Sequence, residues 1–89
     1  MRLGEIVFSI AGRDKDRYYV VVSVENESRV KVADGEFKSI KNAKLKNVKH
    51  IKSSEVVLEK IEQKLIDGDQ VFDTEIRSAL RSYNEGVKN

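Results

Sequence analysis

The sequence predicts a mainly β domain, folded as a small barrel or sandwich and followed by two short helices. Three observations lead to this prediction. Apolar and polar residues alternate in short runs in the first third of the 89 residues, the last third has a helical period, and the middle fits neither pattern. Period two is typical of half-buried strands and period 3.6 of amphipathic helices. A chain of 89 residues supports one modest core, without a second independent one.

Three strands are predicted first, and turn sequences separate them. The strands are expected over residues 6–10, 18–24 and 29–33, where β-branched, aromatic and alternating residues gather. The turns follow at 12–17, at 25–28 and at Asp34-Gly35, the last a strong signal for a two-residue hairpin. Residues 18–22 are apolar on both alternating faces. We therefore expect both faces of this strand to be covered.

The middle segment, residues 37–54, concentrates the positive charge of the chain. It has six lysines and no acid, whereas residues 1–36 sum to −1 and residues 55–89 to −3, which gives the net charge of +2. It is predicted to be an extended connection with a short strand near 48–51 and with its lysines pointing outward. Its expected apolar anchors are Ile40, Leu45, Val48 and Ile51.

Two helices are predicted in the last third. Ser53 or Ser54 is the expected cap of the first, and Asp67-Gly68-Asp69 its end. The second is expected to begin at Asp73 and to stop at Gly86. The two apolar stripes consist of Val57, Leu58, Ile61 and Leu65, and of Ile76, Ala79, Leu80 and Tyr83. Such faces are expected to pack against each other and against the strand 18–24.

Several function classes find no support in the sequence. There is no cysteine, so disulfides and thiolate metal sites are excluded, and the single histidine, His50, lies between lysines and isoleucine. No catalytic group, cofactor, metal or small-molecule substrate is predicted, so an enzyme is not expected. The first residues, MRLGEIVFSIAG, are too short an apolar run to cross a bilayer. A soluble cytoplasmic protein without membrane contact is predicted.

The lysines and the first charged turn form the candidate nucleic-acid site. Runs of lysine usually belong to a solvated surface, but surface charge is normally mixed in sign, and segment 37–54 has no acid. The turn sequence GRDKDR either only reverses the chain at Gly12 or also contacts phosphates, although Asp14 and Asp16 reduce its charge to +1. The candidate RNA-binding residues are Arg13, Lys15, Arg17, Lys38, Lys41, Lys44, Lys46, Lys49, His50 and Lys52.

The six aromatic residues have two interpretations. They are Phe8, Tyr18, Tyr19, Phe37, Phe72 and Tyr83. Rings in such positions belong more often to the core than to a binding surface. Tyr19 on its strand, or Phe37 beside the lysines, could instead stack on a base.

Parts of the sequence resemble a known family. LGEIVFSIAGRDKDRYYVVVSV is similar to the KOW motif, in which a strand leads to a glycine-centred charged loop and a returning strand, and the similarity continues through VKVADGEFKSI to KHI. The chain looks most like the small bacterial KOW-domain RNA-binding proteins related to large-subunit ribosomal proteins. The resemblance implies an SH3-like five-stranded barrel that binds RNA through loops and basic edges. Gly12 matches the hallmark glycine, whereas Asp16 stands where a second glycine is usual.

These observations give one leading hypothesis and one alternative. The leading hypothesis is a noncatalytic protein that binds structured ribosomal RNA, with residues 1–52 as the barrel, 53–89 as a helical extension and the lysines holding most of the RNA. The alternative is a protein-interaction module for a ribosomal or translation-factor partner, with Val57, Ile61, Ile76 or Leu80 as contacts on the acidic helices. The helices, at −3, could also lie over the lysines and compete with RNA.

Overall fold

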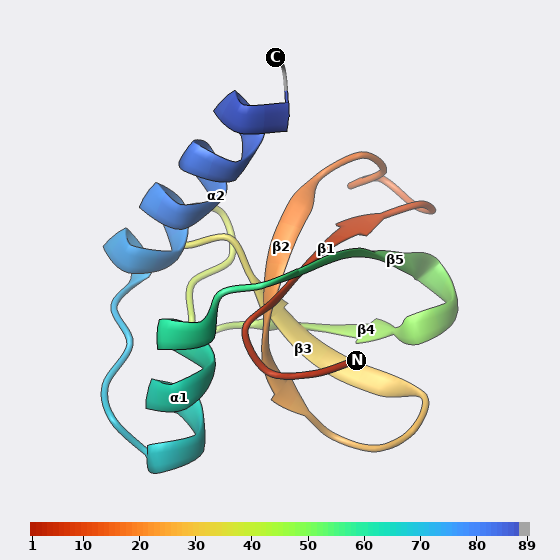
Figure 1. Ribbon diagram of the computed structural model, residues 1–89. Helices are drawn as coiled ribbons and strands as arrows, with labels where there is room; N and C mark the ends of the chain where they lie inside the picture. Colours follow the sequence, from red (N-terminus) through yellow and green to blue (C-terminus); the bar gives the residue numbers. More distant parts are fainter. Residues whose placement is uncertain (88–89) are drawn as a thin grey trace.

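The computed structural model describes residues 1–87 and contains one five-stranded antiparallel sheet followed by two helices (Figure 1). The strand order is β4-β3-β2-β1-β5. The first three strands agree with the sequence prediction to within one residue at each end. The strands are β1 (Glu5–Ser9), β2 (Tyr18–Val24), β3 (Arg29–Ala33), β4 (Lys44–Asn47) and β5 (Ile51–Val57).

The sheet must curl strongly, because its two edges are consecutive in the chain. A flat sheet would separate β4 from β5 by four strand spacings, about 19 Å. Only the three-residue 3₁₀ helix η1 (Val48–His50) joins them, and such a link spans at most about 14 Å. A bulge between Ile6 and Val7, where β1 pairs with β5, adds to the bend. Within residues 1–87 the order of paired strands ends at β4 and β5, so the sheet is curled and open.

Apolar side chains cover both faces of the sheet. One cluster contains Val7, Tyr19 and Val21 with Val30, Val32 and Ile51. On the other face, Ile6, Val20 and Ala33 pack against residues of both helices. Successive residues of β2 therefore point to opposite clusters, as the period of a strand requires. The prediction that both faces of this strand are covered is confirmed.

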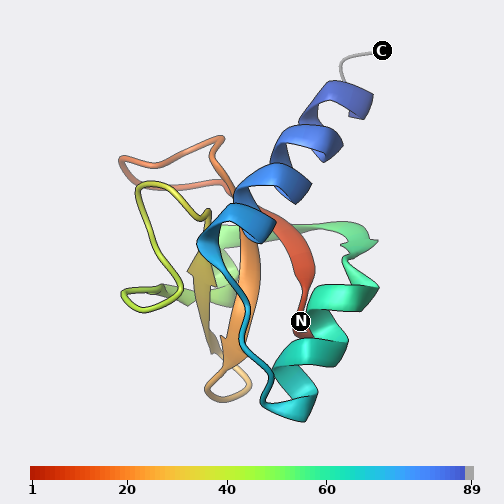
Figure 2. The same ribbon diagram turned by 90° about the vertical axis from the view of Figure 1, so that its left-hand side faces the viewer.

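The helices α1 (Glu59–Asp67) and α2 (Asp73–Val87) lie on the same face of the sheet (Figure 2). Ile61 of α1 and Ile76 and Leu80 of α2 are buried in the cluster with β1, β2 and β3. Gly68 ends α1 in the left-handed conformation, with φ of 75°, as predicted. Within residues 1–87, neither helix has the length and apolar character that crossing a bilayer needs.

The structure corrects the predicted boundary between the sheet and the helices. Residues 51–57 form β5, which pairs with β1, so α1 begins only at Glu59. Ser53 and Ser54 do not cap a helix, because their hydroxyls bond backbone groups of the strands. Strand β5 therefore crosses the boundary expected between residues 52 and 53. At the other end, Gly86 does not stop α2, which continues to Val87.

The middle segment also differs from its prediction. Residues 48–50 form η1 instead of a strand, and the strands of this segment are β4 before η1 and the beginning of β5 after it. Asp34-Gly35 does not form a two-residue hairpin, since residues 34–43 make a longer loop between β3 and β4. Gly35, with φ of 79°, lies against α2, and a β-carbon there would come within 2.2 Å of the carbonyl oxygen of Asp73. This glycine allows the loop to approach the first turn of α2.

Candidate nucleic-acid interface

The loop between β1 and β2, residues 10–17, is a tightly bonded turn. Gly12 and Asp16 both have positive φ, of 86° and 73°. The amide of Asp16 donates to the Ser9 carbonyl at 2.7 Å, and the amide of Ser9 donates to the Arg17 carbonyl at 2.9 Å. Asp is among the residues that tolerate the left-handed region. The turn is therefore made with Asp16 in the position where the KOW pattern usually has a second glycine.

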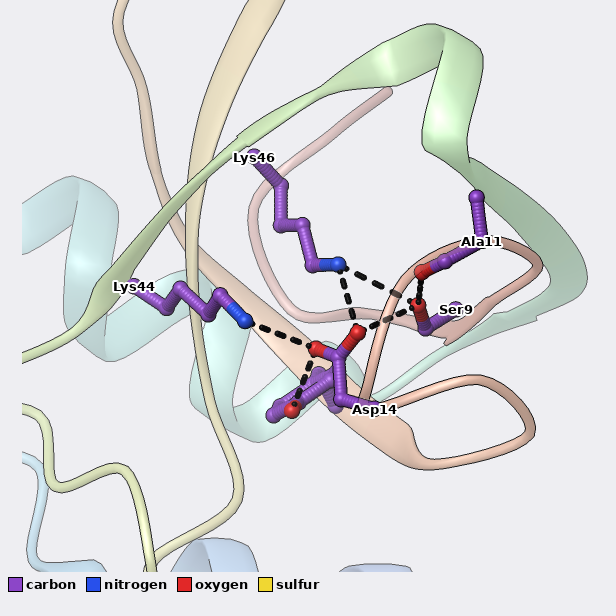
Figure 3. Close-up of polar contacts among 6 residues, drawn as sticks. Ser9, Ala11, Asp14, Lys44 and Lys46 are labelled. Atoms are coloured by element: carbon purple, nitrogen blue, oxygen red, sulfur yellow. Dashed lines mark hydrogen bonds and ion pairs between the residues drawn. The ribbon is translucent and has the colours of Figure 1, made fainter.

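Asp14 points from this loop into the protein, where its carboxylate accepts four hydrogen bonds (Figure 3). Oδ1 accepts from Lys46 Nζ at 2.8 Å and from Ser9 Oγ at 2.9 Å. Oδ2 accepts from Tyr19 Oη at 2.8 Å and from Lys44 Nζ at 3.1 Å. We call these five residues the Asp14 cluster. It fastens the loop to β1, to β2 and to the edge strand β4.

The Asp14 cluster holds its carboxylate ionised although the side chain is only 9% exposed. Burial opposes the charge, but the hydrogen bonds from Lys46, Tyr19, Ser9 and Lys44 outweigh burial and hold the pKa of Asp14 well below its usual value. Two ammonium groups face one carboxylate, so the cluster has a net charge of +1. From the sequence, the charge of Asp14 counts as part of the exposed turn, but in the structure this carboxylate lies inside the protein.

Tyr19 links the apolar core to the cluster and gives the protein a predicted sensitivity to alkaline pH. Burial, together with the hydrogen bond to Asp14, raises the pKa of Tyr19 above its usual value. The hydroxyl therefore stabilises the fold fully below pH 10 or so, the pKa of an unfolded tyrosine, and this contribution is lost as the pH rises toward the folded-state pKa. We expect Tyr19→Phe to cost about 1–2 kcal/mol at neutral pH.

The measurement is urea unfolding between pH 8 and 11, a range of about one unit or more on each side of the ordinary tyrosine pKa. Above pH 10 or so, wild type should lose stability more steeply than Tyr19→Phe. Tyr83→Phe is the matched control, because it removes a tyrosine hydroxyl from a ring that packs against Tyr18, while the hydrogen bond from Tyr19 to Asp14 stays in place. With Tyr19 intact, it should keep the wild-type pH dependence. Equal slopes for wild type and Tyr19→Phe would contradict this assignment.

The expectation that the lysines of segment 37–54 point outward is wrong for Lys46. Its side chain is 8% exposed and also donates to Ser9 Oγ at 3.1 Å. Leu45, expected as an anchor, is exposed instead. The register explains both, because β4 pairs Lys46 with Val30, whose side chain belongs to a buried cluster. Lys46 is thus a structural residue, and Lys44, 37% exposed, is shared between the cluster and the surface.

Most of the other candidate RNA-binding residues lie on two parts of the surface. The loops 10–17 and 34–43 meet through two of their side chains, because the Arg17 guanidinium stands 4.6 Å from the centre of the Phe37 ring. Between these loops is a hollow of about 250 Å³ whose basic lining residues are Arg13, Arg17, Lys38 and Lys44. The second part adjoins the base of the hairpin, where the Ile10 amide donates to the His50 carbonyl at 2.9 Å. It has the exposed side chains of Lys49, His50 and Lys52.

Two candidate cations remain to be placed. Lys15 is exposed at the tip of loop 10–17. Lys41 lies away from the hairpin and lines a hollow together with Leu65 and Phe72, next to the connection between the helices. We call the exposed and half-exposed basic side chains of these two parts, with Lys15, the basic surface. Its members are Arg13, Lys15, Arg17, Lys38, Lys44, Lys49, His50 and Lys52.

The two aromatic residues considered for base stacking differ in exposure. Tyr19 is buried, so stacking by this residue is excluded. Phe37 is 68% exposed beside the basic surface. The sequence reasoning missed Ser9, Asp14 and Tyr19 as partners of the lysines. The one available signal is a tyrosine in an apolar strand, whose hydroxyl needs a partner when buried.

Three of the four apolar residues that the protein-interaction alternative names are buried, although Ile66 of α1 is 61% exposed. Ile61, Ile76 and Leu80 are buried against the sheet, and Val57 is half-buried. Helix carboxylates also have partners outside the lysine segment, since Glu62 pairs with Arg2, and Glu75 with Lys64. The helices therefore serve the core of the domain in the form described.

Comparison with known proteins adds no family assignment, because no protein-family model and no curated protein sequence matches this chain. The similarity to KOW-domain proteins stays a prediction. Among residues 1–87, no three His, Cys, Asp or Glu side chains gather into a group that could hold a metal ion. Function must be inferred from the charge and geometry of the basic surface.

Proposed function

We propose that this chain is a noncatalytic RNA-binding protein that contacts structured ribosomal RNA in a cytoplasmic ribosomal or translation-related complex. One observation carries the proposal: the hollow between loops 10–17 and 34–43 has four basic side chains in its lining, η1 and the start of β5 expose three more, and Asp14 is turned inward and bonded to Lys46. The potential over such a surface attracts polyanions, and phosphates are the groups that Lys and Arg position.

We further propose that the curled sheet is an SH3-like barrel of the KOW type. Strands β1 to β4 pair in sequence order, and β5 returns to pair with β1. The 3₁₀ helix η1 precedes β5, and the glycine-centred charged loop joins β1 to β2. These features support the fold that the KOW resemblance implies. In such a fold the loop 10–17 would face RNA.

The function is tested by binding of ribosomal RNA over a series of salt concentrations. If about four to six phosphates are neutralised, log K should fall with log salt with a slope of about −3 to −5. Filter binding with the full chain measures this slope. The control is an unrelated protein of similar size and equal net charge whose basic residues are not clustered on one surface. Absence of binding at low salt, or a flat salt dependence, would overturn the proposal.

A further inference from the structure

Phe37 is held outward by a turn that leaves its ring no place in the core. The Asp34 carboxylate accepts from the amides of Glu36 at 2.9 Å and Lys38 at 2.8 Å, and the amides of Asp34 and Gly35 both donate to the Lys38 carbonyl. Gly35 seats this turn against the first turn of α2. The ring is therefore presented to solvent by a bonded turn fixed at its base, not by a loose chain.

The Arg17 guanidinium lies over one part of the exposed Phe37 ring. Its guanidinium carbon lies 4.6 Å from the ring centre, a distance at which cation and ring attract each other. Arginine planes and aromatic rings are the two side-chain surfaces on which unpaired RNA bases stack. Here one of each, from loops 10–17 and 34–43, already lies against the other.

The charge differs on the two sides of this pair. The hollow of about 250 Å³ on one side has Arg13, Lys38 and Lys44 in its lining, and Asp14, the one acid that residues 1–87 contribute to this lining, is already bonded to lysine. A hollow of about 470 Å³ on the other side mixes cations with acids; its charged lining residues are Arg17, Asp34, Glu36, Arg77, Arg81 and Glu85. A phosphate is therefore favoured on the first side. That hollow is smaller than the ~300–1,000 Å³ of pockets that enclose a small molecule, so it suits one phosphate of a longer chain.

We propose that Arg17 and Phe37 form a stacking platform for one unpaired RNA base, whose phosphate lies in the hollow lined by Arg13, Lys38 and Lys44. This inference rests on the proposed RNA-binding function and narrows it. The bases of a continuous duplex are stacked on each other and do not offer a free face. The preferred target is then a bulge, loop or strand end in structured RNA, with the remaining cations on the neighbouring backbone.

The test compares two blunt-ended RNA duplexes of the same sequence, each annealed from two strands so that neither contains a loop, one fully paired and one with a single bulged 2-aminopurine. Wild type is expected to bind the bulged duplex more tightly and to change the fluorescence of 2-aminopurine. Phe37→Ala and Phe37→Leu should weaken binding of the bulged duplex about 5- to 100-fold, the range for loss of one base–aromatic stack. Phe37→Tyr should retain it, and none of these variants should change binding of the paired duplex.

Phe72→Ala is the matched control, because Phe72 is also an exposed ring, at 53%, but lies beside the start of α2 and away from the basic hollow. It should bind both duplexes as wild type does. Equal binding of both duplexes by wild type, or equal losses for Phe37→Ala and Phe72→Ala, would overturn the platform and leave RNA binding standing. Failure of wild type to bind either duplex at low salt would overturn both proposals.

Discussion

Asp14→Ala is expected to lower the free energy of unfolding by about 3–5 kcal/mol, the cost of breaking a buried ion pair by removing one partner. The change leaves Lys46 inside the protein at 8% exposure with only Ser9 as a hydrogen-bond acceptor, and Tyr19 loses the partner of its hydroxyl. A domain of this size is stable by about 5–15 kcal/mol, so the loss is a large share of the total. Urea or thermal unfolding measures it.

Asp16→Gly is the matched control for Asp14→Ala. It removes the same charge from the same loop, but Asp16 is exposed and has positive φ, a conformation that glycine adopts without steric cost. Its stability should stay within about 1 kcal/mol of wild type. A second variant, Asp14→Leu with Lys46→Met, should recover part of the loss, because apolar replacement of both partners removes the unpaired charge. Equal effects of Asp14→Ala and Asp16→Gly would contradict the structural role of Asp14.

The same ionisation predicts sensitivity to acid. Because the pKa of Asp14 is lower in the folded chain, its contribution is fully present above about pH 4, the pKa of an unfolded aspartate. It is lost as the pH falls toward the folded-state pKa. Asp14→Asn, which cannot titrate, should therefore flatten the acid side of the stability profile relative to wild type.

Local pattern was sufficient for the elements whose partners lie nearby. The bounds of β2 and β3 are those predicted, because alternation and turn residues act within a few positions. The stripe with Ile76 and Leu80 also packs as expected. Ser53 and Ser54 misled the prediction, since a serine pair before an apolar stripe is typical of a helix cap. Residues 53 and 54 are in a strand because β5 pairs with β1, which lies about 45 residues away. A pairing over this distance cannot be seen in the local sequence pattern.

Of the candidate site, only the exposed residues could be predicted from the sequence. Exposed cations such as Arg13 and Lys49 follow from their surroundings in the sequence. The direction of Asp14 does not, because it depends on Tyr19 five residues away and on Lys46 thirty-two residues away. Lys46 faces inward although Leu45 beside it is apolar, since the register with β3 and the carboxylate of Asp14 outweigh local hydrophobicity.

A triple variant, Arg13→Gln with Lys15→Gln and Lys38→Gln, is expected to lower affinity for ribosomal RNA by about 10²- to 10³-fold near 0.1 M salt. The magnitude follows if each cation neutralises one phosphate, since log K then changes by about 0.7–0.9 per contact for each tenfold change in salt. The slope of log K against log salt should become shallower by about 2–3 in the same titration. All three residues are exposed or half-exposed, so stability should change little.

The matched control for this triple variant removes three cations from other parts of the chain: Arg29→Gln, Lys31→Gln and Lys60→Gln. These lie on β3 and α1, are exposed, and give the same net charge as the first variant. If the position of the charge matters, the control should lose far less affinity. Equal losses in the two variants would mean that RNA responds only to the total charge. The inward turn of Asp14, which leaves three cations and one acid, Asp16, exposed on loop 10–17 beside Lys38, is the reason to expect a difference.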